Sequence, residues 1–202
     1  MITDNVFSNF SSSLGLDMEG WLSPGSPFAK LFDSVNAKTA VEVGVWKGLS
    51  AITLGKHMLS LDGVTRKLYC VDTFLGSTGQ GSAATQENGM TSIQEQFMQN
   101  VVLAGLTDIL VPVPMSSVDA AAEFKKLGFI FDYIYIDANH DYEFVNDDIA
   151  AWWPLLRSGG VMLGHDYVAP QFRGVIRAVD EHSKRVGKDI QVEDTVWYMY
   201  KG

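Results

Sequence analysis

Aspartate side chains stand where three short β-type runs of this 202-residue chain end. Asp72 ends the run KLYCVD, Asp137 ends FIFDYIYID, and Asp166 comes two residues after VMLG. Ligands of open parallel sheets bind beyond the carboxyl ends of the strands. We therefore expect the three carboxylates at one edge of one sheet. Such groups can accept hydrogen bonds from a ligand or take part in proton transfer.

A glycine-containing turn, VGVWKG, follows the first β-type run. Only Gly44 and Gly48 are present, and Glu42 stands where a dinucleotide fingerprint has its first glycine. A carboxylate there would repel a pyrophosphate but would suit an ammonium or a sulfonium group. Because Asp72 is placed to accept hydrogen bonds from ribose hydroxyls, the pair predicts a nucleoside ligand without a phosphate bridge. The alternatives are that the glycines only make a tight turn and that Asp72 caps a helix.

Alternating elements from about residue 38 onward would position these residues. Strand-like runs at 39–43, 67–72, 108–113, 129–137 and 161–164 are separated by helical patterns. This alternation predicts right-handed βαβ units and a parallel sheet. The last runs, DIQVE and TVWYMY, are too close for a crossover helix, so they must be antiparallel. We predict a Rossmann-like, doubly wound α/β fold: a mostly parallel seven-stranded sheet with one antiparallel strand at the C-terminus.

Composition limits the classes of partner. The net charge is −9 at pH 7, which argues against a protein that binds a nucleic-acid backbone. The single cysteine, Cys70, excludes an intramolecular disulfide framework and is consistent with a reducing compartment. Since no signal peptide and no membrane-spanning stretch is visible, we expect a cytoplasmic protein without a membrane partner.

The chain length fits one domain with a short extension. We expect residues 1–22 to form a helical appendage or a lid, and residues 23–202 to form the ligand-binding domain. The long polar loop at 75–90 is a second candidate cover. Exposed Trp and Tyr residues near the termini would suit a homodimer.

Five segments in order resemble class I S-adenosylmethionine (SAM)-dependent methyltransferases, in particular the small-molecule O-methyltransferases of the catechol and macrocin types. The segments are VEVGVWKG, CVDTF, YIYIDANHDYE, LLRSGGVMLGHDY and VWYMYK. The resemblance covers the chain from about Lys38 to its C-terminus. It implies a SAM-binding methyltransferase domain over 23–202 and a small hydroxylated molecule as methyl acceptor.

The resemblance also implies roles for individual residues. Those around Gly44 would contact the methionine part of the cofactor, Asp72 the ribose, and Met115 with Ser116 the adenine. The full expected cofactor set is Glu42, Gly44, Val45, Trp46, Gly48, Asp72, Met115, Ser116 and Asp137. In the family, residues at the positions of Asp137, His165 and Asp166 often bind Mg²⁺. Because His165 replaces an oxygen ligand, this set would also accept Mn²⁺, Fe²⁺ or Zn²⁺.

His140 is the candidate general base, because an imidazole titrates near neutral pH and catechol-type relatives carry their base at this position. Asp137 is the second catalytic candidate, and a metal there would lower the pKa of the acceptor hydroxyl. Alternatively, His140 only bonds a neighbouring backbone group and Asp137 only caps a helix. Two other functions stay open. An NAD(P)-dependent oxidoreductase is disfavoured by Glu42, and a non-catalytic nucleoside-binding module would share the same fold.

Overall fold

The computed structural model describes residues 6–20, 22, 26–76, 89–168 and 170–202. Most of the loop predicted as a cover at 75–90 lies outside the described residues. The elements in chain order are α1 (Phe28–Ser34), β1 (Thr39–Val43), α2 (Leu49–Ser60), β2 (Lys67–Asp72), α3 (Ser92–Leu103), β3 (Leu110–Pro114), α4 (Ser117–Lys126), β4 (Phe131–Ile136), α5 (Tyr142–Trp152), a 3-10 turn η1 (Trp153–Leu155), β5 (Leu156–Gly164), α6 (Arg173–Val186), β6 (Gln191–Glu193) and β7 (Val196–Tyr200).

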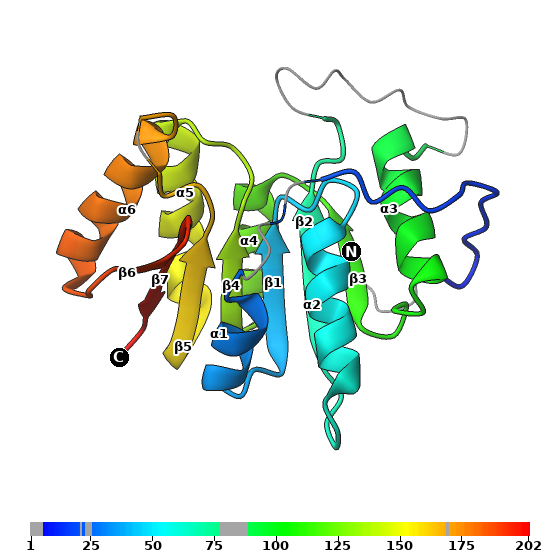
Figure 1. The fold of residues 1–202 in the computed structure, drawn as a ribbon, viewed down its shortest axis with the longest axis horizontal. Helices are drawn as coiled ribbons and strands as arrows, with labels where there is room; N and C mark the ends of the chain where they lie inside the picture. Colours follow the sequence, from blue (N-terminus) through cyan, green and yellow to red (C-terminus); the bar gives the residue numbers. More distant parts are fainter. Residues whose placement is uncertain (1–5, 21, 23–25, 77–88, 169) are drawn as a thin grey trace.

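The strands form one seven-stranded sheet in the order β3-β2-β1-β4-β5-β7-β6 (Figure 1). The pairs β1–β2, β2–β3, β1–β4 and β4–β5 are parallel. β7 is antiparallel to both of its neighbours, β5 and β6. The predicted fold class and the single antiparallel strand are therefore confirmed. Because the chain turns from β1 towards β2 on one side and later places β4 on the other, the carboxyl end of β1 is a topological switch point.

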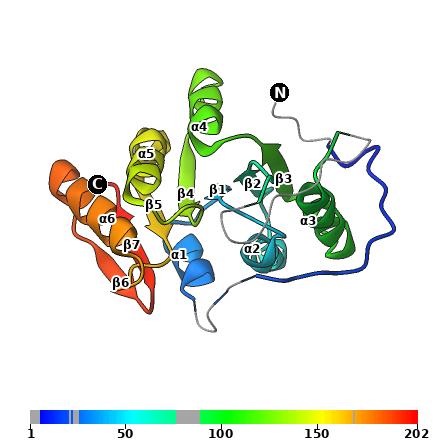
Figure 2. The same cartoon turned by 90° about the horizontal axis from the view of Figure 1, so that it is seen from above.

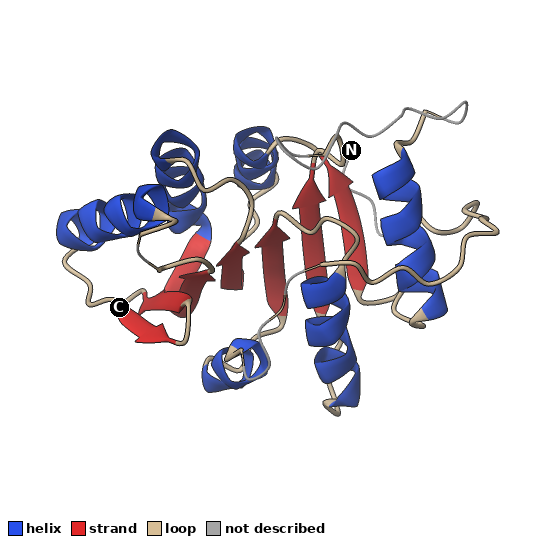
Figure 3. Ribbon diagram, turned by 45° about the horizontal axis from the view of Figure 1, so that its top comes forward, coloured by secondary structure: helices blue, strands red, loops and turns tan. Residues whose placement is uncertain are grey.

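Helices cover both faces of the sheet (Figures 2 and 3). α1, α2 and α3 pack on one face, and α4, α5 and α6 pack on the other. Strand side chains alternate between the two cores. In β1, Ala40 belongs to the first core, whereas Val41 and Val43 belong to the second. Glu42 therefore points to the face that α1 and α2 cover, as the two-residue period requires.

Local sequence sets the helix ends near the site. Gly48 adopts φ +93° immediately before α2, a conformation that glycine tolerates best. Thr91 caps α3 by accepting a hydrogen bond from the Gln94 amide, and Ser116 caps α4 in the same way from Asp119. The cap residues place the first turns of these helices at the carboxyl edge of the sheet.

The N-terminal segment differs from the expectation of a helical appendage. Residues 6–20 contain turns and extended chain without a helix, and they lie along the outer side of α3 (Figures 1 and 2). Phe7, Phe10, Leu14 and Met18 follow a helical spacing, but the Ser run at 11–13 and Gly15 are weaker helix formers, and the chain is held by hydrogen bonds from α3 instead. The expected exposed aromatic surface near the termini is only partly present, because Trp197 in β7 is 1% exposed.

None of the helices in the described part of the chain combines the length and the apolar character needed to cross a membrane.

Candidate active site

Asp72 organises the glycine turn that follows β1. One carboxylate oxygen accepts hydrogen bonds from the backbone amides of Val45 and Trp46, each at 3.0 Å. The other oxygen accepts from the amide of Phe74 at 2.8 Å. Asp72 is thus not a helix cap, since Thr91 caps α3. A carboxylate has about four lone-pair sites, so Asp72 keeps capacity for a ligand hydroxyl.

The same turn lies directly against the end of β4. The Gly44 amide donates to the Val71 carbonyl at 2.8 Å, and the Asp137 amide donates to the Val43 carbonyl at 2.8 Å. A Cβ atom on Gly44 would lie 2.2 Å from the Asp137 carbonyl oxygen, and Gly44 has φ +87°. Only glycine permits both the dihedral angle and this backbone approach. The ends of β1, β2 and β4 are therefore fixed to one another.

Glu42 is buried beneath this turn rather than facing a ligand openly. Its side chain is 1% exposed. One carboxyl oxygen accepts from the Ser50 hydroxyl, and the other has no hydrogen-bond partner among the described residues. Burial raises the pKa of Glu42 to about 8, and the charges of Asp137 and Asp72 add to the shift. At neutral pH this acid therefore mostly holds its proton, and its unpaired oxygen is available to a donor.

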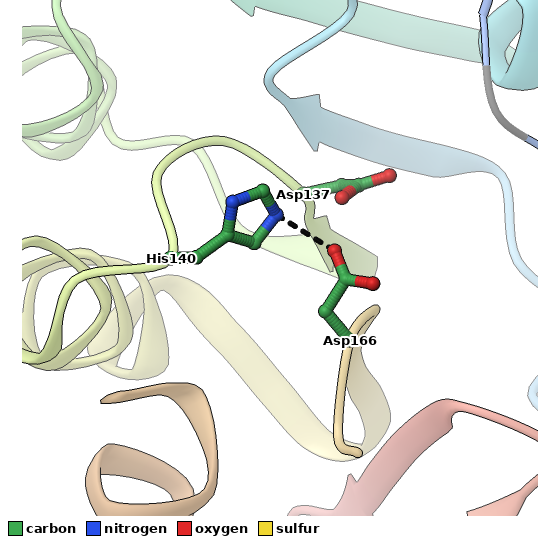
Figure 4. Close-up of side chains that lie close together, drawn as sticks. All are labelled: Asp137, His140 and Asp166. Atoms are coloured by element: carbon green, nitrogen blue, oxygen red, sulfur yellow. Dashed lines mark ion pairs between the residues drawn. The ribbon is translucent and has the colours of Figure 1, made fainter. Parts of the chain in front are cut away.

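A chain of side chains joins the ends of β4, β5 and the β6–β7 turn. His140 Nε2 lies 2.7 Å from one Asp166 oxygen (Figure 4), and His165 Nδ1 lies 3.0 Å from the other. The second His165 nitrogen lies 2.9 Å from the Thr195 hydroxyl. Hydrogen bonding to Asp166 raises the pKa of both imidazoles. Although burial opposes it, the bonds from His140 and His165 hold the pKa of Asp166 well below its usual range.

Asp137 completes this acidic edge. Its carboxylate accepts a hydrogen bond from the Tyr135 hydroxyl at 2.6 Å. Burial nevertheless raises the pKa of Asp137. Ligand atoms of Asp137, His140 and Asp166 all lie within 4.8 Å of one another, so these three side chains could hold a metal ion. Figure 4 shows them converging from the ends of β4 and β5.

His165 stands beside this group rather than within it. The sequence-based metal set was Asp137, His165 and Asp166, whereas the structure brings His140 to the position of the third ligand. Both ring nitrogens of His165 are already engaged, by Asp166 and by Thr195. The donor set of two carboxylates and one imidazole is that of a transition-metal site more than that of a magnesium site.

The residues expected at the adenine follow β3, next to Asp72. The Met115 amide donates to the Asp72 carbonyl at 3.1 Å. Ser116 is exposed and precedes α4, where its hydroxyl caps the helix. The structure therefore brings the turn after β1, the end of β2 and the turn after β3 to one edge, as the sequence predicted.

Three contacts of this site were absent from the sequence-based set. Tyr135 supports Asp137, and the period of two along β4 could have indicated it, because the two residues share a face of the strand. Ser50 bonds Glu42 from the first turn of α2. Thr195 reaches His165 from the β6–β7 turn, a contact between distant segments that no local pattern signals.

Comparison with known proteins decides the family. Residues 41–167 match the model of a family described as a methyltransferase domain. The chain belongs to this methyltransferase family. The matched segment runs from β1 to the residues just after β5, and so contains the turn, Asp72, Asp137, His140 and Asp166. A search of curated protein sequences gave no match.

Solved structures share the fold of this methyltransferase. An O-methyltransferase from Bacillus cereus in complex with SAH is 16% identical, with a TM-score of 0.63 and coverage of 89% of this chain and 82% of that one. The O-methyltransferase TomG from Streptomyces achromogenes, involved in tomaymycin synthesis and solved with SAM, is 16% identical, with a TM-score of 0.62 and coverage of 90% and 82%. A calicheamicin methyltransferase is 16% identical, with a TM-score of 0.65 and coverage of 87% and 77%.

Proposed function

We propose that this methyltransferase transfers a methyl group from SAM to a hydroxyl group of a small molecule, in the cytoplasm. The observation that carries the proposal is the shared edge of the sheet. There the Asp72-bonded turn, suited to a nucleoside, stands beside the His140–Asp166 pair, suited to a proton transfer. The solved O-methyltransferases with SAM or SAH support the same choice of cofactor.

The residues at this edge fit SAM better than a dinucleotide. The buried unpaired oxygen of Glu42 can accept a hydrogen bond from the cofactor's ammonium group. Carboxylates of Asp72 and Asp137 provide negative potential near a sulfonium, whereas a pyrophosphate would be repelled. The proposed cofactor-binding residues are Glu42, Gly44, Val45, Trp46, Gly48, Asp72, Met115, Ser116 and Asp137. SAM supplies an activated methyl group on a positively charged sulfur, ready for in-line displacement.

His140 is proposed as the general base. Its Nε2 faces the Asp166 carboxylate, so this nitrogen carries the proton and Nδ1 is left as an acceptor. Bound SAM would supply the methyl group, and as the acceptor oxygen displaced the sulfur at the methyl carbon, the hydroxyl proton would pass to Nδ1 of His140. Asp166 would stabilise the imidazolium that results.

A divalent metal is a second way to activate the same hydroxyl. Asp137, His140 and Asp166 would hold it, and a Lewis acid there would lower the pKa of the acceptor. His140 would then be a ligand, and the hydroxyl proton would need another acceptor. Mn²⁺, Fe²⁺ or Zn²⁺ suits this set of donors better than Mg²⁺.

Methyl transfer from radiolabelled SAM to a panel of phenols, sugars and polyketide alcohols tests the function. His140→Gln should lower the turnover rate at least about 100-fold, because general-base catalysis contributes roughly that much. Binding of S-adenosylhomocysteine (SAH), the demethylated product, should stay unchanged. His57→Gln is a matched control. His57 lies away from the site, where its Nε2 is 2.8 Å from an Asp33 carboxylate oxygen. Equal turnover in the His140 variant and the control would contradict the assignment of the base.

A further inference from the structure

The N-terminal strap, defined here as residues 12–19, is bound along the polar side of α3. The Gln99 side-chain amide donates to the Leu14 carbonyl, and that of Gln96 donates to the Gly15 carbonyl, both at 2.9 Å. The Ser12 hydroxyl donates to Glu95 at 2.8 Å. These contacts fix the backbone of an irregular segment over α3.

Asn100 joins the strap to the turn that follows β1. Its amide nitrogen donates to the Asp17 carbonyl at 2.6 Å and to the Lys47 carbonyl at 2.8 Å. Its amide oxygen accepts from the Asp17 backbone at 3.1 Å and from Gln96 at 2.9 Å. Both donors and both acceptor positions of the carboxamide are thus used, and the residue is 0% exposed.

Lys47 adds a second connection between the same two segments. Its ammonium group lies 2.7 Å from the Asp17 carboxylate and 2.6 Å from that of Glu19. Both acids are substantially exposed, so these ion pairs add little to stability. Hydrogen bonds of a fully buried carboxamide are more costly to lose, because the carboxamide of Asn100 would be left unpaired in the interior. Asn100 is therefore the main connection.

Lys47 stands within the turn whose amides Asp72 holds, between Trp46 and Gly48. Trp46 is held at φ +49°, which is an unfavourable conformation for a non-glycine residue. Such a conformation persists only when its surroundings stabilise it. The Asn100 bond to the Lys47 carbonyl holds the turn in addition to the Asp72 bonds to the Val45 and Trp46 amides, so the strap and the turn share Asn100 as an anchor.

We propose that Asn100 is a positioning residue for the cofactor turn, and that through it the docking of the N-terminal strap and the binding of cofactor stabilise each other. This inference rests on the proposed function, since it assigns the turn to SAM. Linkage makes the effect reciprocal: a docked strap tightens cofactor binding, and bound cofactor tightens the strap by the same factor. The segment expected from sequence to be an appendage or a lid is thereby given a role.

SAH titration calorimetry and hydrogen exchange on the full-length chain test the inference. Asn100→Asp keeps the side-chain shape but cannot donate to the Asp17 and Lys47 carbonyls. We expect it to raise the dissociation constant for SAH about tenfold, as for a buried hydrogen-bond group left unpaired. Asn146→Asp makes the same chemical change on α5 and should stay within about twofold of the wild type. In the wild type, SAH should slow exchange of the amides at 14–17, a measurement that needs no variant.

Three results would be decisive. Weaker SAH binding in Asn100→Asp, together with SAH-dependent protection of the strap in the wild type, supports the inference. Unchanged affinity in Asn100→Asp, or strap exchange indifferent to SAH in a wild type that binds it, overturns the inference alone. A wild type that does not bind SAH overturns the proposed function as well, and so distinguishes the two failures.

Discussion

Glu42 is a protonated acid at neutral pH in the folded chain, because burial raises its pKa from 4.5 to about 8. The unfolded chain releases this proton near pH 4.5, so the folded state binds more protons between the two values. The free energy of unfolding therefore falls as pH rises from about 5 to about 8. The carboxylate expected from the sequence to attract a cation acts first as a buried neutral group.

Replacing Glu42 with Gln should remove this pH dependence. Relative to the wild type, Glu42→Gln should become more stable as pH rises, by up to about 4 kcal/mol at pH 8. Urea unfolding at pH 5 and pH 8 measures the difference. Glu123→Gln, which alters a surface ion pair with Lys126, is the control and should show no such trend. Parallel stability curves for Glu42→Gln and the wild type would contradict the buried state of Glu42.

His140 should make the reaction depend on pH with a definite sign. The hydrogen bond to Asp166 raises the pKa of His140, so the imidazole becomes a free base only above that pKa. The kcat/KM of methyl transfer should therefore increase with pH along its acidic limb. Asp166→Asn removes the charge, so the limb should move to lower pH while the maximal rate falls. A limb that does not move would show that His140 is not the titrating group.

The backbone at Gly44, just after β1, lies against the backbone at Asp137, just after β4, and substitution of Gly44 tests this close approach. Gly44→Ala meets both an unfavourable φ of +87° and the Asp137 carbonyl, whereas Gly63→Ala at φ +86° has no atom within 4 Å of the new Cβ. The first variant should lose at least about 2 kcal/mol more unfolding free energy than the second, because only it forces backbone to move. Equal losses in thermal or urea unfolding would contradict the described approach.

Sequence patterns predicted the elements of the sheet well and the peripheral chain poorly. The run KLYCVD became β2 with the same bounds, and the helical pattern from Leu49 became α2. Hydrophobic period and glycine positions are local signals, which explains these matches. Local signals do not indicate the conformation of the strap, because its backbone is held by Gln96, Gln99 and Asn100, which are far away in the sequence. Of the expected helical appendage or lid, the helical form is not found over residues 6–20.

The sequence predicted which residues lie at the carboxyl edge of the sheet. It did not predict which of these side chains pair with one another. The βαβ alternation predicts parallel strands, whose carboxyl ends lie at one edge, and this places Asp72, Asp137 and Asp166 at that edge. The order of the strands within the sheet was not predicted. Which imidazole turns towards which carboxylate depends on loop conformation after β4 and β5. Thus His140 rather than His165 joins Asp137 and Asp166 within 4.8 Å.

Removal of divalent metal is a test of the whole enzyme. If Asp137, His140 and Asp166 hold a metal in the working protein, dialysis against EDTA should abolish methyl transfer, and Mn²⁺ should restore it better than Mg²⁺. Metal analysis by mass spectrometry before and after dialysis is the accompanying measurement. Full activity in metal-free protein would leave His140 as the base and remove the metal from the mechanism.

Calorimetric titration of the purified protein with SAH and, separately, with NAD⁺ and NADP⁺ tests the central claim most directly. The carboxylates of Asp72 and Asp137, at the ends of β2 and β4 beside the turn after β1, should admit the nucleoside that lacks a phosphate bridge. We predict saturable binding of SAH that Asp72→Ala weakens, and no binding of either dinucleotide. Binding of NAD⁺ or NADP⁺ without binding of SAH would contradict the account.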